Sequence, residues 1–392
     1  MKHTIQRPQV PHVGASRPVV APIYPSVVYA SDDPDMLDAQ YEGRTPGFTY
    51  AREGHPNADA LARRIDVMER TLDGLVLGSG MAAVAAVLLG LTKAGDHVIG
   101  GNQLYGRSLR MMNEDLPRLG IETSLADPTD VAAFEAALKP NTRLALIEVV
   151  SNPTLRVADV EGIAKLCRDR GILLVVDNTF TTPAAIRPLE LGADIVLHSV
   201  TKLLAGHSDV TLGWVGANDQ DLMDKIRVFA VTTGMTPSPQ ECWLAERGLA
   251  TFDLRFERAQ ATAEALAAYL SVQKGVKRVL YPTRADHPDA MRAQGLLRGY
   301  GCNMVSFEIE GGRAAANAFV RAADGVAFAP TLGDVGTTLS HPASSSHRAL
   351  SPDARADLGI SEGFFRVSVG LEDPKALTAT FEAGLKAARA VK

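Results

Sequence analysis

ILLVVDNTFTTP, residues 172–183, and ADIVLHSVTKLLAGHSDVTLGWV, residues 193–215, decide how this chain folds. Each stretch contains a short apolar run, Ile172–Val176 in the first and Ile195–Leu197 in the second. Runs of this kind are typical of strands that are buried on both faces of a parallel sheet. The spacer between the two stretches has the length of a helix, so the pattern predicts an α/β fold.

Polar side chains follow each of these predicted strands. Asp177 ends the first, and His198, Ser199, Thr201 and Lys202 follow the second. Ligand sites in open α/β sheets lie just beyond the carboxyl ends of the strands, so these groups would share one crevice. A lysine that forms an imine, a carboxylate that keeps a pyridine nitrogen protonated and hydroxyls for a phosphate suit pyridoxal 5'-phosphate (PLP). The stretch therefore indicates a PLP site.

Both key residues also have ordinary interpretations. A lysine is usually a solvated surface residue. Asp177, with Asn178 and Thr179 after it, equally suits the N-cap of a helix. Lys202 follows a buried strand and lies in a run of small and polar residues, which speaks against a plain surface position. On the pattern alone, both interpretations stay open.

Length, composition and charge limit the class of protein. The chain has 392 residues, 46% of them hydrophobic and 22% charged, which is typical of a soluble globular protein of two or three domains. A net charge of −5 gives no basic surplus for nucleic acid or an anionic membrane. Cys167, Cys242 and Cys302 are far apart, which predicts reduced thiols in a cytoplasmic protein without a metal site. MKHTIQRP, the N-terminal sequence, lacks the apolar core of a signal peptide, and the longest apolar run, Met81–Leu91, is too short for a bilayer.

The chain divides into three parts. In residues 1–58 many prolines interrupt any long element, yet apolar and aromatic residues such as Ile23 and Phe48 are present, which suggests an arm lying on a partner subunit. Residues 59–250 alternate between strand-like and helix-like segments, which predicts the PLP-binding α/β domain. Residues 251–392, which begin with a long helix at about 252–270, are expected to form a smaller α+β domain.

The alternation in the second part predicts a mainly parallel, seven-stranded sheet with helices on both faces. The strand candidates are residues 75–77, 97–100, 121–125, 144–150, 172–176, 194–197 and 211–215. The helix candidates include residues 59–72, 82–91, 131–138 and 160–170. In the third part we expect strands at 276–281 and 304–309 and a helix at 374–392.

A turn of small residues, Gly78 to Met81, connects the first strand candidate to the next helix. Backbone N–H groups at such a helix start can hold a phosphate. Turns of this composition are common, so a purely structural turn fits equally well.

Eight motifs identify a family resemblance: YAREGHPN, GSGMAA, LYGRS, SNPT, VVDNTF, HSVTKLLAGHSD, HPASSSH and FRVSVGLED. With these the chain resembles the trans-sulfuration (Cys/Met metabolism) family of PLP enzymes over about residues 18–387. The family includes cystathionine γ-synthase, cystathionine γ- and β-lyases, methionine γ-lyase and O-acylhomoserine sulfhydrylases. The resemblance implies PLP fold type I, which is aspartate-aminotransferase-like, and a homotetramer of dimers that share active sites.

The resemblance also implies roles for the cofactor-binding residues. Lys202 would form the Schiff base with PLP and move protons at the substrate Cα, and Asp177 would pair with the pyridinium nitrogen. Tyr105 would stack on the cofactor ring and assist the leaving group. The phosphate would be held by the N–H groups of Gly80 and Met81, the hydroxyls of Ser199 and Thr201, and Tyr50 and Arg52 from the neighbouring subunit.

For the substrate, the resemblance implies that Arg366 binds the α-carboxylate and that Asn152 contacts both cofactor and substrate. Thr331 stands where the family usually has serine. Arg107 stands where many relatives have glycine and the methionine γ-lyases have cysteine. It adds a cation next to Tyr105, which would either contact an anionic substrate group or lower the pKa of the phenol.

Other departures and the histidines are also informative. His55 replaces the usual asparagine of a Gly-Asn-Pro turn. Gly336 followed by Thr337 fully matches neither the cystathionine-cleaving relatives nor the sulfhydrylase-like relatives. His341 and His347 lack metal-ligand spacing and are interpreted as residues that order a loop. His198 and His207 are expected to form hydrogen bonds around the lysine loop.

The function expected from these residues is PLP-dependent γ-elimination or γ-replacement on a homoserine-derived amino acid, such as cystathionine, methionine or an O-acylhomoserine. β-Elimination, as in a cystathionine β-lyase, is the alternative, because the machinery is common to both. An aminotransferase is disfavoured by the matches at Tyr50, Arg52 and the HPAS motif. A non-catalytic PLP-fold protein would be expected to lack Lys202, Tyr105 or Arg366.

Overall fold

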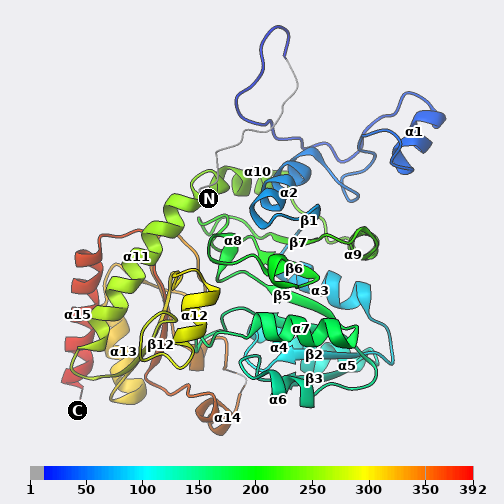
Figure 1. The fold of residues 1–392 in the computed structure, drawn as a ribbon. Helices are drawn as coiled ribbons and strands as arrows, with labels where there is room; N and C mark the ends of the chain where they lie inside the picture. Colours follow the sequence, from blue (N-terminus) through cyan, green and yellow to red (C-terminus); the bar gives the residue numbers. More distant parts are fainter. Residues whose placement is uncertain (1–12, 349, 392) are drawn as a thin grey trace.

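The computed structural model describes residues 13–348 and 350–391, and its centre is a seven-stranded sheet (Figure 1). The strand order is β1-β7-β6-β5-β4-β2-β3, and β3, β2, β4, β5 and β6 are mutually parallel, whereas β7 is antiparallel to both of its neighbours. The strands are β1 (Asp73–Leu77), β2 (His97–Gly101), β3 (Glu122–Ala126), β4 (Thr142–Glu148), β5 (Leu173–Asp177), β6 (Ile195–Ser199) and β7 (Gly213–Ala217). The predicted α/β class and the mainly parallel seven-stranded sheet are confirmed.

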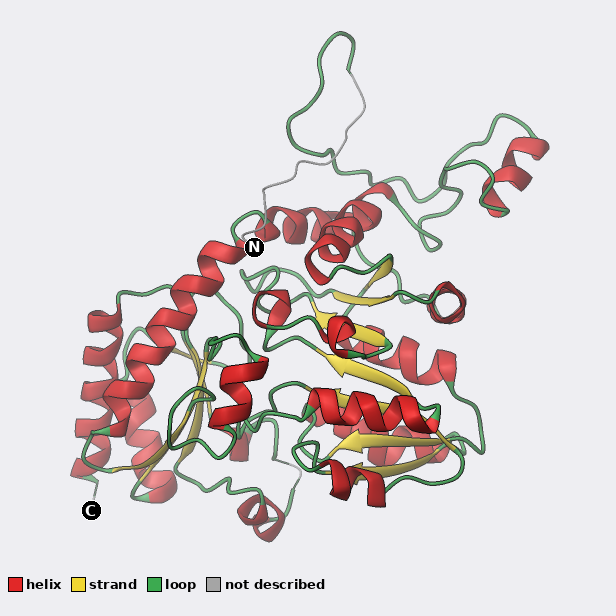
Figure 2. Cartoon of the chain, in the orientation of Figure 1, coloured by secondary structure: helices red, strands yellow, loops and turns green. Residues whose placement is uncertain are grey.

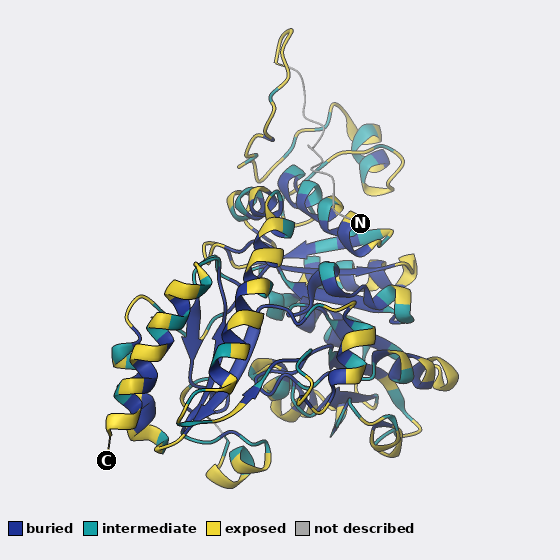
Figure 3. Cartoon of the chain, turned by 60° about the vertical axis from the view of Figure 1, so that its left-hand side comes forward, coloured by how far each residue is buried: buried dark blue, intermediate teal, exposed yellow. Residues whose placement is uncertain are grey.

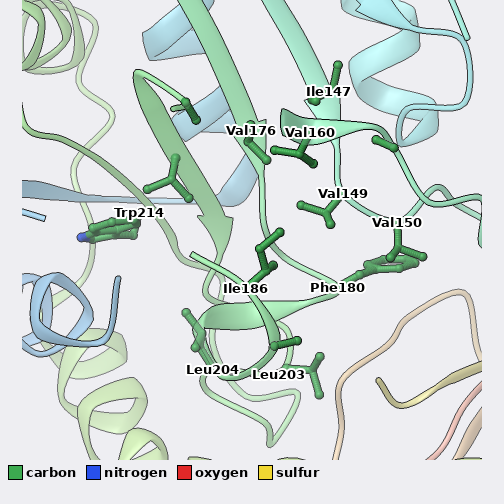
Figure 4. Close-up of a cluster of buried hydrophobic side chains, with 14 of the residues drawn as sticks. Ile147, Val149, Val150, Val160, Val176, Phe180, Ile186, Leu203, Leu204 and Trp214 are labelled. Atoms are coloured by element: carbon green, nitrogen blue, oxygen red, sulfur yellow. The ribbon is translucent and has the colours of Figure 1, made fainter. Parts of the chain in front are cut away.

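Both faces of this sheet are buried. Side chains alternate along each strand, so neighbouring residues of one strand pack into apolar clusters on opposite faces. On β4, Leu144 and Leu146 belong to the apolar cluster under α3 (Gly80–Leu91) and α9 (Gln220–Thr232). Ala145 and Ile147 belong to the cluster on the other face, under α2 (Pro56–Glu69) and α7 (Val160–Arg170). Figure 4 shows part of this second cluster, in which Val160 of α7 lies beside Val176 and Ile147 of the sheet. Helices therefore cover the sheet on both sides, as predicted.

The C-terminal part forms a second sheet that α11 (Phe252–Ser271) joins to the first, as Figure 2 shows. Its order is β10-β11-β12-β9-β8. The strands are β8 (Val276–Leu280), β9 (Met304–Ile309), β10 (Ala327–Phe328), β11 (Thr338–Ser340) and β12 (Phe364–Ser368). α13 (Gly312–Ala322) and α15 (Pro374–Ala390) pack on it around an aromatic cluster of Phe307, Phe319, Phe365 and Phe381. Figure 3 shows the resulting amphipathic helices, with buried faces inward and exposed faces outward.

The remaining elements are short and connect these layers. The helices are α4 (Gly106–Arg110), α5 (Leu116–Arg118), α6 (Val131–Ala136), α8 (Thr182–Ala185), α10 (Pro239–Leu249), α12 (Ala290–Leu296) and α14 (Pro352–Asp357). A π-helical turn, Met111–Asp115, lies between α4 and α5, and 3₁₀ turns span Pro188–Leu191 and Pro342–Ser344. Within the part of the chain that is described, no helix combines the length and the apolarity that crossing a membrane requires.

The N-terminal arm extends away from the two sheets (Figure 1), and its described residues contribute no strand to either of them. It is mostly irregular, as predicted, but it contains one helix, α1 (Pro34–Tyr41). The proline begins this helix rather than breaking it, because the first helical position has no intrahelical partner for an N–H group. Asp33 caps the helix by accepting the Met36 N–H at 2.7 Å.

Candidate active site

The main pocket lies at the carboxyl ends of β4, β5 and β6, where the larger sheet faces β12 of the smaller one. It encloses about 970 Å³ of empty volume, including its open mouth. The predicted site residues that line it are Gly80, Met81, Tyr105, Asn152, Asp177, Ser199, Thr201, Lys202, Thr331 and Arg366. Three predicted residues, Tyr50, Arg52 and Arg107, lie outside it.

Lys202 lies in the turn that follows β6, with its amine inside the pocket. Nζ donates to Thr331 Oγ1 at 3.4 Å, so the amine is held only weakly. Burial lowers the pKa of Lys202, and the positive charge of Arg366 lowers it further. A lower pKa increases the fraction of free amine, which is the form that attacks a carbonyl carbon.

Asp177 is the last residue of β5, and its carboxylate opens on the same pocket. Burial raises the pKa of Asp177, whereas hydrogen bonds from Thr179 and the nearby His198 lower it. The Thr179 N–H donates to Asp177 Oδ1 at 2.9 Å. The N-cap interpretation of Asp177 is wrong, because α8 begins only at Thr182 and its N-cap is Thr181.

The turn before α3 lies unusually close to Ser199 at the end of β6. Ser79 is the N-cap and accepts the Ala82 N–H at 3.0 Å. The N–H groups of Gly80 and Met81, at the first two helical positions, have no intrahelical acceptor. A Cβ on Gly80 would lie only 2.7 Å from Ser199 Cβ, so only glycine fits beside this hydroxyl-bearing residue. The pocket thus has an anion-binding end made of helix N–H groups and a serine.

Thr201 lines the same end, but its hydroxyl is already paired. Thr201 Oγ1 donates to Leu212 O at 3.1 Å and accepts the Leu212 N–H at 2.9 Å. The Thr211 side chain, which sequence reasoning did not single out, also lines the pocket. Thr201 would have to give up a backbone bond before it donated to a phosphate.

Arg366 on β12 provides the cationic wall of the pocket. Its Nη1 donates to Asn152 Oδ1 at 2.9 Å and its Nη2 to Thr331 O at 2.8 Å, whereas its buried Nε has no partner among the described residues. Burial lowers the pKa of Arg366 to about 10, so the guanidinium still carries its charge at neutral pH. An unpaired buried N–H on a fixed cation is suited to a carboxylate ligand.

Tyr105 lies at the mouth of the pocket, 44% exposed, directly before α4. Its N–H donates to Glu148 Oε1 at 2.6 Å. Glu148, which ends β4 and lines the pocket, is a residue that sequence reasoning missed. Its position at a strand end is the same signal that identified Asp177. Arg107, on α4, is exposed and does not reach into the pocket.

Tyr50 and Arg52 lie together on the arm, away from the Lys202 pocket. The Arg52 guanidinium carbon is 5.2 Å from the centroid of the Tyr50 ring. Arg52 lines a separate, smaller cavity together with His55 and Arg227. Within one chain, these two residues are therefore not brought to the predicted phosphate site, and their role there stays a prediction.

The histidines form hydrogen bonds that order the loops. His55 accepts the Ala58 N–H with Nδ1 at 3.2 Å and donates from Nε2 to Pro237 O at 3.1 Å. His341 pairs with Ser344 Oγ and Glu362 O, His347 with Ser346 Oγ, and His207 with Ala205 O. Among the described residues, no three His, Cys, Asp or Glu side chains are grouped so that they would hold a metal ion.

Two further positions, Gly336 and Thr337, are held by local hydrogen bonds. Thr337 donates to Glu372 from both its N–H and its hydroxyl, and the Gly336 N–H donates to Asp334 Oδ1 at 2.7 Å. Neither residue lines the pocket. The buried His198 pairs with Glu69, which also accepts from Asn178 Nδ2 at 2.8 Å, so this network lies directly behind Asp177.

The residues present fit PLP. One wall of the pocket carries a weakly held amine, the adjoining strand end carries a half-buried carboxylate, and a glycine turn at a helix start lies beside Ser199. These are the groups that bind an aldehyde, a pyridinium nitrogen and a phosphate. The unpaired Arg366 Nε leaves a further site for a substrate anion.

Comparisons with known proteins agree with this chemistry. The sequence model of the family described as Cys/Met metabolism PLP-dependent enzyme matches residues 4–386. The L-methionine γ-lyase of Pseudomonas putida is 38% identical over 96% of this chain and 94% of its own length. The cystathionine β-lyase of Bacillus subtilis is 40% identical over 86% of each chain. The crystal structure of cystathionine γ-synthase from Xanthomonas oryzae pv. oryzae, in complex with aminoacrylate and cysteine, superimposes with a TM-score of 0.90 and 36% identity over 95% of this chain and 94% of that one.

Proposed function

This chain belongs to the Cys/Met metabolism family of PLP-dependent enzymes, and on that premise we propose that it catalyses γ-elimination or γ-replacement on a homoserine-derived amino acid. The substrate class is cystathionine, methionine or an O-acylhomoserine. One observation carries the proposal: the amine of Lys202, the carboxylate of Asp177 and the guanidinium of Arg366 open on one pocket.

In this reaction, Arg366 and Asp177 have separate binding roles. When bound, PLP supplies an electron sink that withdraws electron density from the substrate Cα. Arg366, through its unpaired Nε, binds the substrate α-carboxylate and so orients the amino acid. Asp177, held by Thr179, keeps a proton on the ring nitrogen, which strengthens the sink.

Proton transfer then falls to Lys202 and Tyr105. Lys202 Nζ takes the proton from Cα and returns it at a neighbouring carbon, a task that suits a buried amine with a lowered pKa. Tyr105 is partly exposed at the mouth of the pocket, which suits a group that assists the leaving group. Its phenol is the group placed to protonate the departing sulfur or oxygen.

Elimination or replacement at Cγ, rather than at Cβ, is favoured by two of the relatives named above. The Pseudomonas putida protein is a methionine γ-lyase and the Xanthomonas oryzae structure is a cystathionine γ-synthase. β-Elimination is the second candidate, because the Bacillus subtilis cystathionine β-lyase is 40% identical to this chain. Arg107 and Gly336, which depart from the family pattern, lie outside the pocket, so neither favours one of the two outcomes.

The test is product analysis with the PLP-loaded protein. We would offer L-cystathionine, L-methionine, and O-acetyl-L-homoserine with sulfide. Release of 2-oxobutanoate, or formation of homocysteine from the ester, is the expected result. Pyruvate with homocysteine from cystathionine would replace the proposal by β-elimination. Amino-group transfer to a 2-oxo acid, with the side chain retained, would identify an aminotransferase instead.

A further inference from the structure

Glu148 occupies a position next to Asp177 that the predicted roles do not explain. It ends β4 as Asp177 ends β5, and the two residues are paired in the parallel register of these strands. Paired residues on neighbouring strands lie about 5 Å apart and point to the same face. Both side chains line the pocket, so two carboxyl groups lie side by side where the cofactor ring is expected.

Glu148 also binds the backbone of Tyr105. Its Oε1 accepts the Tyr105 N–H at 2.6 Å, across 43 residues of sequence. Tyr105 occupies the N-cap position of α4, where its own side chain makes no capping bond. Glu148 thus holds the N–H side of this residue, while the Tyr105 carbonyl accepts the Leu109 N–H at 2.9 Å. The Tyr105 ring projects from this point into the mouth of the pocket.

We propose that Glu148 is a positioning residue for the reaction, which fixes Tyr105 through its backbone and does so as a neutral acid beside the ionised Asp177. The proposal rests on the proposed function, because it concerns the same site and the same tyrosine. The proposal places the shared proton on Glu148, because Asp177 is the carboxyl group expected to face the pyridinium nitrogen. Glu148 touches Tyr105 and not the reacting atoms, so it acts through the tyrosine.

The charges around the pair support this assignment. Two adjacent carboxyl groups that are partly shielded from water favour a state in which only one of them is ionised at neutral pH. Asp177 accepts hydrogen bonds from Thr179 and lies near His198, which favours its charged form. Burial raises the pKa of Glu148 well above its ordinary value, the charge of Asp177 raises it further, and only the Tyr105 N–H opposes the shift.

The other titratable groups of the pocket do not reverse this order. Those that line it, besides the pair, are Tyr105, Lys202 and Arg366. Arg366 donates to Asn152 and Thr331, and the amine of Lys202 lies nearest to Thr331. Among the described residues, no cation forms an ion pair with Glu148.

Three variants test the proposal. Glu148→Gln keeps an oxygen for the Tyr105 N–H and cannot ionise, whereas Glu148→Ala removes the acceptor. Asp194→Asn is the matched control, because Asp194 is also a half-buried carboxyl that accepts a strand N–H, from Leu174 at 2.7 Å, but at the opposite end of the strands. We expect kcat to fall about tenfold in Glu148→Ala, less than about threefold in Glu148→Gln, and to stay unchanged in Asp194→Asn.

Two readouts do not depend on turnover. Hydrogen exchange of the Tyr105 amide in the cofactor-free protein should be slow in the wild type and in Glu148→Gln, and faster in Glu148→Ala. The pH midpoint of the bound cofactor's visible band should move by less than about half a unit in Glu148→Gln, because no negative charge is removed. In a Tyr105→Ala background, Glu148→Ala should cause little further loss, since both act through one group.

The outcomes separate this inference from the proposed function. Equal losses in Glu148→Gln and Glu148→Ala would show that the charge of Glu148 is needed, and would overturn the inference. So would wild-type turnover and amide protection in Glu148→Ala. If the wild type releases none of the expected products while the exchange pattern holds, the proposed function fails and the contact between Glu148 and Tyr105 stands.

Discussion

At the scale of single residues, Lys202 shows how a common surface residue becomes reactive. Its amine is mostly buried, it lies near the cationic Arg366, and it donates to a threonine hydroxyl at 3.4 Å rather than to a carboxylate. Each of these features disfavours the ammonium form or leaves it unpaired. The chain thus keeps this lysine available for bonding to a carbonyl carbon.

We predict that Lys202→Ala abolishes both the covalent attachment of PLP and turnover. The visible absorbance band of the bound cofactor should be lost, and kcat should fall by at least about 10³-fold, because no other side chain in the pocket is a primary amine. Lys274→Ala, which removes an exposed lysine, is the control and should change neither. A Lys202→Ala protein that kept the band and turned over substrate would contradict the assignment.

The candidate site was predictable from sequence where function coincides with a strand end. Asp177 and Lys202 follow apolar runs, and the structure brings both to one pocket. Glu148 follows such a run as well, but on the sequence it is followed by further apolar residues, so the end of its strand was placed two residues too late. That Thr201 is paired with Leu212 depends on a loop geometry that no motif encodes.

At the scale of elements, α2 is held by a residue that departs from the family pattern. His55 is fully buried, caps the helix through Nδ1 and reaches Pro237 O through Nε2. Burial lowers the pKa of His55, which preserves the neutral ring that both bonds require. An asparagine at this position would suit the cap, but it is too short to replace both contacts of the imidazole.

We predict that His55→Ala lowers the free energy of unfolding by about 1–3 kcal/mol, because it removes the N-cap bond and leaves Pro237 O unpaired. His55→Asn should cost less, since asparagine is a preferred N-cap. Urea unfolding followed by circular dichroism measures both. Equal destabilisation by the two variants would mean that the bond to Pro237, and not the cap, carries the effect.

A second contact of α2 makes stability depend on pH. Asp66 packs against β7, where it accepts the Trp214 Nε1–H at 3.1 Å. Burial raises the pKa of Asp66 from 3.8 to about 7, so the folded state holds this proton more tightly than the unfolded state. The stabilisation is therefore complete below about pH 4 and is lost as the pH rises through 7.

We predict that Asp66→Asn raises the free energy of unfolding at pH 8 by about 1–3 kcal/mol and removes part of its decline between pH 4 and 7. The amide keeps an oxygen for Trp214 and has no charge to bury. Asp324→Asn, an exchange at an exposed loop position, is the control. Urea midpoints measured across this pH range decide the matter, and parallel profiles for wild type and Asp66→Asn would contradict the prediction.

Most elements were predictable because their pattern is local. Strands such as β4 and β5 contain continuous apolar runs, and each strand of the larger sheet was located to within about two residues. α1 was missed because its proline was interpreted as a breaker, although Asp33 and Pro34 together form a start signal. The start of α2 at Pro56, three residues early, was missed for the same reason.

At the scale of the whole molecule, the described part of the arm is joined to its own chain by hydrogen bonds such as that from Trp243 Nε1 to Ala21 O, at 2.8 Å, but much of it is exposed. It exposes apolar side chains, among them Val27, Val28 and Tyr41, and it carries Tyr50 and Arg52 away from the Lys202 pocket. The homotetramer of dimers with shared sites stays a prediction, and so do the domain limits at residues 58 and 250. If the sites are shared, Arg52 completes the phosphate site of a second copy.

Mixing two inactive variants tests this sharing. Lys202→Ala and Arg52→Ala chains, unfolded together and refolded, should regain about a quarter of wild-type turnover. Half of the random dimers would be hybrids, and each hybrid would hold one site with Lys202 from one chain and Arg52 from the other. Neither variant alone should approach this value, because each lacks a required group in both sites.

The control for the mixing experiment uses two residues that lie in the same pocket of one chain. Lys202→Ala mixed with Asp177→Asn should regain nothing, since Lys202 and Asp177 both line the pocket of a single subunit and every hybrid site lacks one of them. Recovery in this control would point to exchange of longer segments between chains. No recovery with Arg52→Ala would instead place the arm on its own subunit and make each chain's site complete by itself.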